Sequence, residues 1–424
     1  MNTTPDFDGD VIVLGGGLAG QTLALALDQA GLSVALVDAL PFETQLADEF
    51  DGRASALAYT SFRMLDALGA GDRLRAHAQR IEDILVADGR PHGGPRPGGP
   101  GPFTLHFDRE EIHPGTDGEP LGWMVENRHI RLALAQTLRE RAGITLFAPV
   151  KADRWERIAG GMVLHLADGK RLKGAMIAAC DGRFSRSRRQ AGVRTAGWAY
   201  GQKGIVATVE HEKPHQGVAY EYFLPGGPFA ILPLTGNRSS LVWTEKTAIA
   251  DTIVGLDGNR FQQELDARFG DFLGTVRETG PRWGYPLGLT IAEQFCSDGI
   301  AYCGDAARGI HPLAGQGFNL GIRDAAALAE VLAEAKSLGL DLGSLVTLRR
   351  YERWRKFDSL SLSASTDIFN RLFSNDITPI RLARGLGMSV IDRMPAARKF
   401  FMRQAGGETG DLPRLLRGER LDAA

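Results

Sequence analysis

Short apolar runs alternate with longer stretches of mixed polarity along the N-terminal half of the chain. The run at 10–14 leads into a glycine-rich turn and an alanine- and leucine-rich stretch at 21–30, and a second apolar run follows at 32–37. Short apolar runs bounded by turn residues are typical of buried strands, whereas alanine and leucine favour a helix. The pattern therefore predicts a strand–helix–strand unit with two parallel strands.

Comparable apolar runs occur further along the chain. One at 175–180 is followed by Asp181 and Gly182, and another at 299–303 is followed by Gly304 and Asp305. A loop with four glycines and one proline comes next, and the composition of 325–335 predicts a helix whose first turn begins near Gly317. A strand that ends in Gly-Asp before such a loop predicts a small-molecule site at the carboxyl edge of a sheet.

The middle of the chain has a different pattern. Four β-rich runs are separated by turn residues and predict an antiparallel sheet, at 205–209, 219–223, 229–232 and 240–244. Two more strands of this second sheet are predicted at 81–87 and 103–107, on either side of a proline- and glycine-rich loop at 90–102. The stretches at 345–368 and 378–404 are predicted to be helical.

Composition is that of an ordinary globular protein. Of 424 residues, 24% are charged and 43% are hydrophobic, and the net charge of −2 gives no electrostatic reason to expect a nucleic-acid partner. The polar N-terminus is unlike a signal peptide, and no apolar run reaches about 18 residues. The three cysteines lack metal-ligand spacing, so no metal is expected, and two of them end apolar runs, which predicts buried thiols in the cytoplasm.

The first turn carries the glycine fingerprint of dinucleotide-binding proteins. Gly15 permits the tight turn, Gly17 lets a pyrophosphate come close to the backbone, and Gly20 lets the helix pack on the strand. Asp38 ends the second strand, where an acid bonds both ribose hydroxyls. This motif suits both FAD and NAD, but Asp305 offers a second strand-end acid for the ribityl half of an extended ligand, which favours FAD.

The expected fold class is α/β. It consists of a Rossmann-like FAD-binding domain, an inserted and largely antiparallel β-sheet substrate domain, and a C-terminal helical segment. The expected boundaries are 1–75, 120–188 and 285–350 for the FAD-binding domain, 76–119 and 189–284 for the substrate domain, and 351–424 for the helical segment.

The stretch from Gly304 to Gly321 resembles the second flavin-binding motif of the class A flavoprotein monooxygenases. Its fuller string, from His311 to Gly321, is similar to the ubiquinone-biosynthesis hydroxylase family within that group. The resemblance implies that the flavin is bound by Gly304, Asp305, Pro312, Gly315, Gln316, Gly317, Phe318 and Asn319. It also places Pro312 and His311 beside the reacting end of the flavin as catalytic candidates, although a structural hydrogen bond would equally explain a loop histidine.

Three further residues match cofactor-binding positions of that family. Arg53 is expected to contact the flavin or its phosphates, Asn127 to bring an amide near the flavin, and Asp181 to touch the flavin side and assist nicotinamide binding. Each also has a plain structural explanation: Arg53 as a solvated loop residue, Asn127 as a helix N-cap, and Asp181 as part of a turn that closes the domain. The sequence leaves both explanations open.

A sheet laid over the flavin would form one wall of a substrate cavity. Tyr220, Phe223 and Pro233 are the candidate substrate contacts, although core packing would equally explain any one of them. The stretches from Tyr200 to Gln202 and from Ala219 to Phe223 also resemble the hydroxylase family, so the resemblance runs through both domains.

The resemblance implies hydroxylation of the aromatic ring of a prenylated phenol or quinol in ubiquinone biosynthesis, through a flavin C4a-hydroperoxide formed from O2. NAD(P)H or a protein electron donor would reduce the flavin. Two alternatives stay open: an FAD-dependent reductase of isoprenoid double bonds, and a flavin-carrying scaffold in a biosynthetic complex.

The C-terminal stretch at 377–405 carries six basic residues interleaved with apolar ones. Such a stretch suits peripheral contact with the inner face of the membrane, or with proteins of a ubiquinone-biosynthesis complex. Alternatively, its apolar side packs on the flavin domain and its charges face water.

Overall fold

A six-stranded sheet lies at the centre of the nucleotide-binding part of the chain. The computed structural model describes residues 7–47, 52–89, 100–115, 118–309, 316–356, 387 and 390–422. The strand order of this sheet is β18-β19-β12-β1-β2-β8, and only β18 runs antiparallel to its neighbour. Its strands are Cys296–Ser297, Ile300–Tyr302, Met176–Ala179, Val11–Leu14, Val34–Val37 and Ile144–Phe147 in that order. The predicted strand–helix–strand unit is therefore present.

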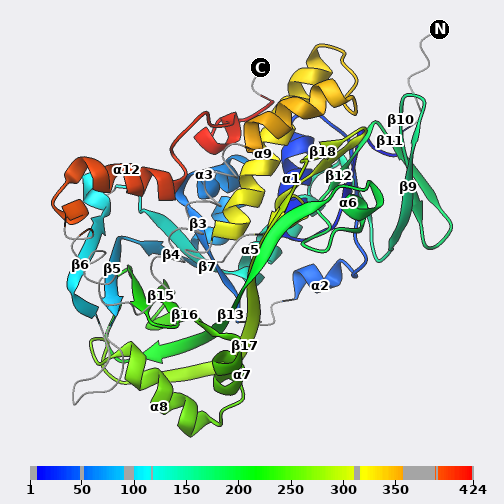
Figure 1. Ribbon diagram of the computed structural model, residues 1–424. Helices are drawn as coiled ribbons and strands as arrows, with labels where there is room; N and C mark the ends of the chain where they lie inside the picture. The colour runs from blue at the N-terminus through cyan, green and yellow to red at the C-terminus, as the bar shows by residue number, and fades with distance from the viewer. Residues whose placement is uncertain are drawn as a thin grey trace.

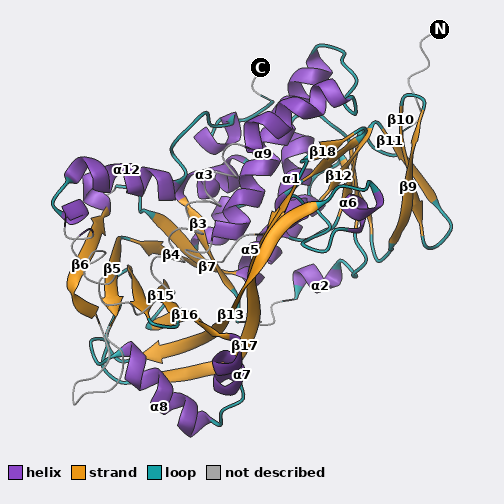
Figure 2. Cartoon of the chain, viewed as in Figure 1, coloured by secondary structure: helices purple, strands orange, loops and turns teal. Residues whose placement is uncertain are grey.

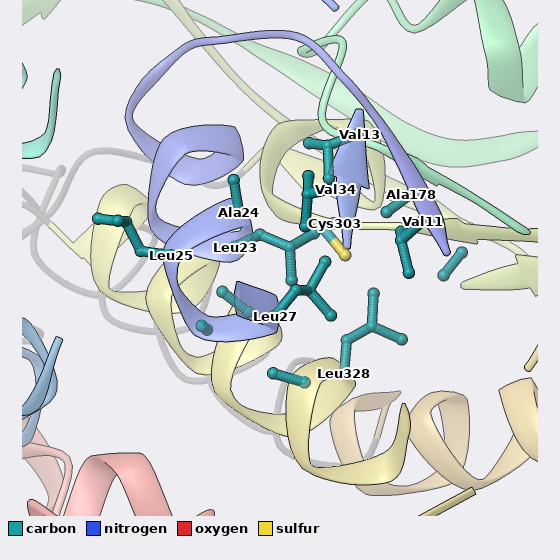
Figure 3. Packing of buried hydrophobic residues seen from close by; sticks show 14 of the residues in the cluster. Val11, Val13, Leu23, Ala24, Leu25, Leu27, Val34, Ala178, Cys303 and Leu328 are labelled. Carbon is teal, nitrogen blue, oxygen red and sulfur yellow. The ribbon is translucent and has the colours of Figure 1, made fainter. Parts of the chain in front are cut away.

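Helices cover this sheet, which explains why its strands are apolar without interruption. Helix α1 (Leu18–Gln29) packs beside α9 (Gln316–Ser337), and Figure 3 shows Leu23 and Leu27 of α1 directed at the sheet residues Val11 and Val34. Cys303, which ends one of the two apolar runs, is buried as expected, whereas Cys180, at the end of the other run, is only half-buried; Cys296 is also buried.

Two smaller sheets complete the nucleotide-binding part. Strands β3 (Ala54–Ala58) and β4 (Ala78–Ile81) both pair with β7 (Gly122–Glu126), so residues 78–81 lie here although they fall inside the expected substrate segment 76–119. A three-stranded antiparallel sheet that the sequence did not predict stands at the far right of Figure 1, with strands β9 (Ala152–Ile158), β10 (Gly161–Leu166) and β11 (Arg171–Gly174). Short helices lie between these elements: α2 (Glu43–Leu46), α3 (Tyr59–Ala67), α4 (Gly71–Arg75), α5 (Asn127–Arg139) and α6 (Arg186–Gln190).

The second part of the chain contains an eight-stranded sheet in the order β20-β17-β13-β16-β15-β14-β5-β6. All neighbours are antiparallel except the parallel pair β14–β5, so the expected largely antiparallel sheet is confirmed. Its strands are Arg308–Gly309, Val276–Ala292, Thr195–His211, Arg238–Lys246, Gly227–Leu234, Val218–Leu224, Asp83–Gly89 and Pro100–Asp108 in sheet order. The long strands β13 and β17 run from this sheet up to the nucleotide-binding part (Figure 1).

The two faces of the eight-stranded sheet have different partners. Helices α7 (Thr247–Val254) and α8 (Gly258–Phe269) cover one side of this sheet, which we call the outer face (Figure 2). On this face Tyr222 and Trp243 form an apolar cluster with Phe261. The opposite side, called the inner face, looks toward the nucleotide-binding part. An ion pair of 2.8 Å between Arg238 Nη1 on β16 and Glu126 Oε1 at the end of β7 joins the two parts on this side.

The C-terminal region is helical where it is described. Residues 345–356 form one helix, α12 spans Pro395–Gly406 and a short 3-10 helix spans Arg414–Arg417. The rest of the predicted helices at 345–368 and 378–404 lies outside the described residues. Within the described chain, no helix is long and apolar enough to cross a membrane.

Candidate functional site

The turn after β1 has the geometry that the glycine fingerprint requires. Gly15 has a φ of +100°, and a Cβ there would lie 2.5 Å from the carbonyl oxygen of Cys180. A Cβ on Gly20 would lie 1.8 Å from the carbonyl oxygen of Gly15, so the helix can approach the strand only without a side chain. At Gly17, which caps α1, a Cβ would meet no protein atom within 4 Å. The space in front of the helix N-terminus is therefore open to an anion.

Asp38 lies beside this turn at the end of β2. Its Oδ2 accepts a hydrogen bond from the Gly16 N–H, and its Oδ1 accepts one of 2.7 Å from the Leu40 N–H. Gly15, Gly17 and Asp38 line a cavity of about 560 Å³ that extends to Trp155 on β9. This volume is within the range of small-molecule sites. The sheet of β9, which the sequence did not predict, thus supplies one wall of the site.

Asp181 lines the same cavity from the end of β12. Its Oδ2 accepts a hydrogen bond of 3.0 Å from the Ser187 N–H at the start of α6. Its Oδ1 is buried and has no hydrogen-bond partner among the described residues. Because a buried carboxylate oxygen without a partner is costly, a ligand that donates a hydrogen bond here would be favoured.

The second predicted edge of the site is the 3-10 turn Gly304–Ala306 after β19. Gly304 has a φ of +59°, and a Cβ there would lie 3.2 Å from Ala19 Cβ on α1, so this turn lies close to the first fingerprint. The Asp305 side chain is accessible, yet the dense protein around its carboxyl group raises its pKa, while Arg183 and Arg308 act in the opposite direction. Both strand-end acids, Asp38 and Asp305, therefore belong to sheet edges that carry the fingerprint glycines.

A buried ion cluster, which no local sequence pattern indicates, holds this second edge in place. Asp324 on α9 accepts two hydrogen bonds of 2.9 Å from Arg308 and one of 2.8 Å from Arg355 Nε. It also accepts a hydrogen bond of 2.9 Å from the Gly304 N–H. Burial opposes ionisation of Asp324, but the two guanidinium groups beside it keep the pKa of this carboxyl below its usual range.

A second arginine connects the Asp181 turn to the Gly304–Ala306 turn. Arg188 on α6 donates hydrogen bonds of 2.6 Å to the Ala306 carbonyl oxygen and 3.1 Å to the Arg183 carbonyl oxygen. Its own N–H is held by the Ser185 side chain, which caps α6. The two loops at the carboxyl edge of the sheet are therefore fixed relative to each other.

Arg53 and Asn127 are brought together at one end of the β3–β7 pair. The Asn127 N–H donates a hydrogen bond of 2.9 Å to the Arg53 carbonyl oxygen, and Ser55 Oγ donates one of 2.7 Å to Asn127 Oδ1. The N-cap of α5 is Glu126 and Asn127 is the first residue of the helix, so the interpretation of Asn127 as the N-cap is wrong. Contact of Arg53 and Asn127 with a flavin stays a prediction.

The start of α9 is tied to β3. Asn319 Oδ1 accepts a hydrogen bond of 2.9 Å from the Ala58 N–H, and Asn319 Nδ2 donates one of 2.8 Å to the Ala56 carbonyl oxygen. These bonds make Asn319 a residue that positions β3. A Cβ on Gly317 would meet no protein atom within 4 Å, and Phe318 is half-buried against the core. Gln316 begins the helix, whereas His311, Pro312 and Gly315 lie outside the described residues.

The three candidate substrate contacts lie on different faces of the eight-stranded sheet. Tyr220 packs against Phe272 with ring centroids 4.7 Å apart, on the outer face, and Pro233 shares that face because it is two positions from Ile231. Phe223 lies on the inner face, where it clusters with Leu105. Strand alternation therefore leaves Phe223 as the one candidate directed at the nucleotide-binding part.

These features define a dinucleotide-binding fold in which two glycine-containing strand ends lie close together at the carboxyl edge of one sheet. The chain belongs to the family described as FAD binding domain, which matches residues 8–341. It is 44% identical over 412 residues to a ubiquinone hydroxylase of Rhodospirillum rubrum, UbiL, covering 96% of this chain and 92% of the relative. It is 32% identical over 404 residues to 3-demethoxyubiquinol 3-hydroxylase of Escherichia coli, covering 94% of this chain and 98% of the relative.

A solved structure has the same fold. The p-nitrophenol 4-monooxygenase PnpA from Pseudomonas putida is similar with a TM-score of 0.75 at 18% identity, and the match covers 93% of this chain and 96% of that one. This likeness confirms the fold. The family match and the two ubiquinone-hydroxylase relatives confirm the resemblance to the ubiquinone-biosynthesis FAD monooxygenases, and FAD is the cofactor that the family description names.

Proposed function

We propose that this protein is an FAD-dependent monooxygenase that hydroxylates the aromatic ring of a prenylated phenol or quinol intermediate of ubiquinone biosynthesis. The observation that carries the proposal is the 44% identity to a ubiquinone hydroxylase along 96% of the chain. FAD supplies the oxygen-activating chemistry when bound. The chain's own residues hold it: Gly15, Gly17 and Gly20 by close backbone approach, and Asp38, Asp181 and Asp305 by hydrogen bonds.

The reductant is part of the same proposal. The described chain contains one strand–glycine turn–helix unit of the dinucleotide type, and FAD uses it. NAD(P)H would therefore bind transiently at the flavin domain, or a protein donor would deliver the electrons.

The test uses purified, flavin-loaded protein with NADH or NADPH, a short-chain prenylated phenol and ¹⁸O2. We expect phenol-dependent oxygen uptake and one labelled oxygen atom in the phenolic product, measured by mass spectrometry. If both nicotinamides fail, dithionite-reduced protein mixed with oxygenated phenol keeps the test independent of the donor. Reduction of the prenyl double bond without label would identify an isoprenoid reductase, and reoxidation unaffected by phenol would identify a flavin-carrying scaffold.

We also propose that α12 docks the enzyme on an anionic membrane surface. One side of α12 packs on the rest of the protein, because Met402 is buried and Arg398 Nε lies 2.8 Å from Glu111 Oε1. The solvent side of α12 and of the residues just before it combines exposed apolar and basic side chains. They are Val390, Arg393, Met394, Lys399, Phe400 and Arg403. Such a mixture suits an interface with anionic lipid.

Replacing Arg393, Lys399 and Arg403 together with glutamate is expected to weaken vesicle binding at low salt by about 1 kcal/mol or more per residue. Co-sedimentation with phosphatidylglycerol vesicles measures the effect, and high salt should reduce wild-type binding. The matched control replaces the exposed residues Lys213, Lys246 and Arg277 of the substrate part with glutamate. Equal loss in both triple variants, or salt-independent binding, would contradict docking through α12; binding to a partner protein but not to vesicles would point to a complex instead.

A further inference from the structure

The inner face of the eight-stranded sheet carries a carboxyl group in apolar surroundings. Glu221 on β14 points to this face because its neighbours Tyr220 and Tyr222 pack on the outer face. Directly across from it are Ala230 on β15 and Val86 on β5. Along its own strand, Ala219 and Phe223 share the inner face with it, and both belong to apolar clusters.

The inner face of the eight-stranded sheet is the one directed toward the nucleotide-binding part of the chain. Leu232 and Leu234 on β15 pack with Met124 on β7, and Arg238 on β16 pairs with Glu126. At the other end of the sheet, β17 pairs with β20, where Thr290 lies opposite Gly309, a few residues after Asp305. The sheet that carries Glu221 is thus hydrogen-bonded to the segment that carries the second flavin-binding motif.

The carboxyl group of Glu221 has no hydrogen bond or ion pair with any described residue. Part of the Glu221 side chain is accessible to solvent, but the dense protein around its carboxyl group raises the pKa of that group to about 8. On the two flanking strands, β5 and β15, the ionisable group that shares the inner face is Asp88, which lies across from Phe223. Further across the sheet, the inner face carries Arg238 on β16, which is paired with Glu126, and Glu210 opposite it on β13. An isolated carboxyl group in such a place costs folding free energy, and groups of this kind concentrate at functional sites.

We propose that Glu221 binds the ring hydroxyl group of the phenolic substrate and accepts its proton, an assignment that rests on the function proposed above. The carboxylate oxygen accepts the hydrogen bond from the phenol O–H. In the proton transfer the phenol O–H bond breaks, an O–H bond forms on the carboxyl group, and the electron pair remains on the phenolate oxygen. That pair increases the electron density of the ring, which the electrophilic oxygen attacks.

The surroundings of Glu221 suit the rest of a prenylated phenol. Phe223, two positions further along β14, clusters with Val86 and Leu105. Ile391, shortly before α12, packs against the same cluster. This apolar cluster therefore extends from the neighbourhood of Glu221 toward the helix proposed to dock on lipid, which is the direction from which an isoprenoid tail would enter.

The first test measures binding without turnover. Flavin-loaded protein is titrated with 2-prenylphenol and with its methyl ether, and the change in flavin absorbance reports the dissociation constants. We expect wild type to prefer the phenol by about tenfold, Glu221→Leu to lose that preference, and the matched control Tyr220→Phe, on the outer face, to keep it. An equal preference in wild type and Glu221→Leu, or none in wild type, would overturn the assignment.

The second test uses Glu221→Gln, which keeps the shape and removes the ionisation. In wild type, phenol affinity should rise as pH increases through about 8, because the carboxylate that forms is a stronger acceptor than the acid. In Glu221→Gln this rise should be absent, and a rise with the same midpoint would overturn the proposal even if Glu221→Leu fails to fold. If phenol binding depends on Glu221 and on pH as expected but no labelled product forms in the ¹⁸O2 assay, the assignment of Glu221 stands and the hydroxylase function is refuted. Failure of the Glu221 assignment and failure of the proposed function are therefore distinguishable.

Discussion

Replacing Asp324 with asparagine is expected to lower the free energy of unfolding by about 3–5 kcal/mol, the range for removing one partner of a buried ion pair. Asp324 is fully buried, and Arg308 and Arg355 beside it are 2% and 1% exposed. Asparagine keeps the shape of the side chain but leaves two guanidinium groups in the interior without a compensating charge. Guanidinium chloride unfolding of the apoprotein measures the loss.

A smaller effect on flavin affinity should accompany the loss of stability. Asp324 Oδ2 accepts the Gly304 N–H, so the substitution also loosens the turn that presents Asp305. The control is Asp72→Asn, because the Asp72 side chain is 98% exposed and lies 3.5 Å from Arg75 on the surface, where no measurable change is expected. Unfolding curves of Asp324→Asn that superimpose on wild type would contradict a structural role for the cluster.

Local patterns in the sequence were sufficient for the cofactor-binding edge. The turn from Gly15 to Gly20 depends on glycine conformation and on the strand and helix directly beside it, and all of these are encoded within a few residues. The second edge at Gly304 and Asp305 follows the same logic. Both turns can be predicted because the residues that determine them are adjacent in the chain.

Contacts between distant segments could not be obtained in this way. Arg355 contacts Asp324 only after the helix at 345–356 has folded back on α9. Arg238 contacts Glu126 only when the two parts of the chain come together. Charged residues usually remain in solvent, so the sequence gives no reason to bury these particular ones. The parallel pairing of β14 with β5 also cannot be predicted from the sequence, since pairing between strands that are far apart in the chain leaves no local signal.

The substrate wall shows how a one-residue difference changes an interpretation. Their aromatic character makes Tyr220 and Phe223 candidate substrate contacts, but alternation along β14 places Tyr220 on the outer face and Phe223 on the inner face. Glu221 is not among the sequence candidates because an acid in a strand is normally solvated. The sequence does contain a signal for it. Ala219 and Phe223, two positions before and after Glu221, are apolar, so a strand would place Glu221 on the same buried face as these two residues.

Gly17→Val is expected to leave a folded protein that has lost FAD. Gly17 has a φ of −70°, which valine adopts without strain, and a Cβ there would meet no protein atom within 4 Å. The space that the valine methyl groups would fill is the space that the pyrophosphate needs in front of the α1 N-terminus. We expect FAD affinity to fall by roughly a hundredfold or more, since the backbone N–H groups can no longer reach the phosphates.

Gly20→Val provides the contrast that separates loss of ligand from loss of fold. A Cβ at Gly20 would lie 1.8 Å from the Gly15 carbonyl oxygen, so this variant should lose thermal stability together with FAD. The flavin-to-protein absorbance ratio after gel filtration measures the cofactor, and circular dichroism melting of the apoproteins measures the fold. Gly17→Val should melt close to the wild-type apoprotein, because the open side of Gly17 faces the ligand. Wild-type flavin content in folded Gly17→Val would show that the pyrophosphate does not bind at this helix N-terminus.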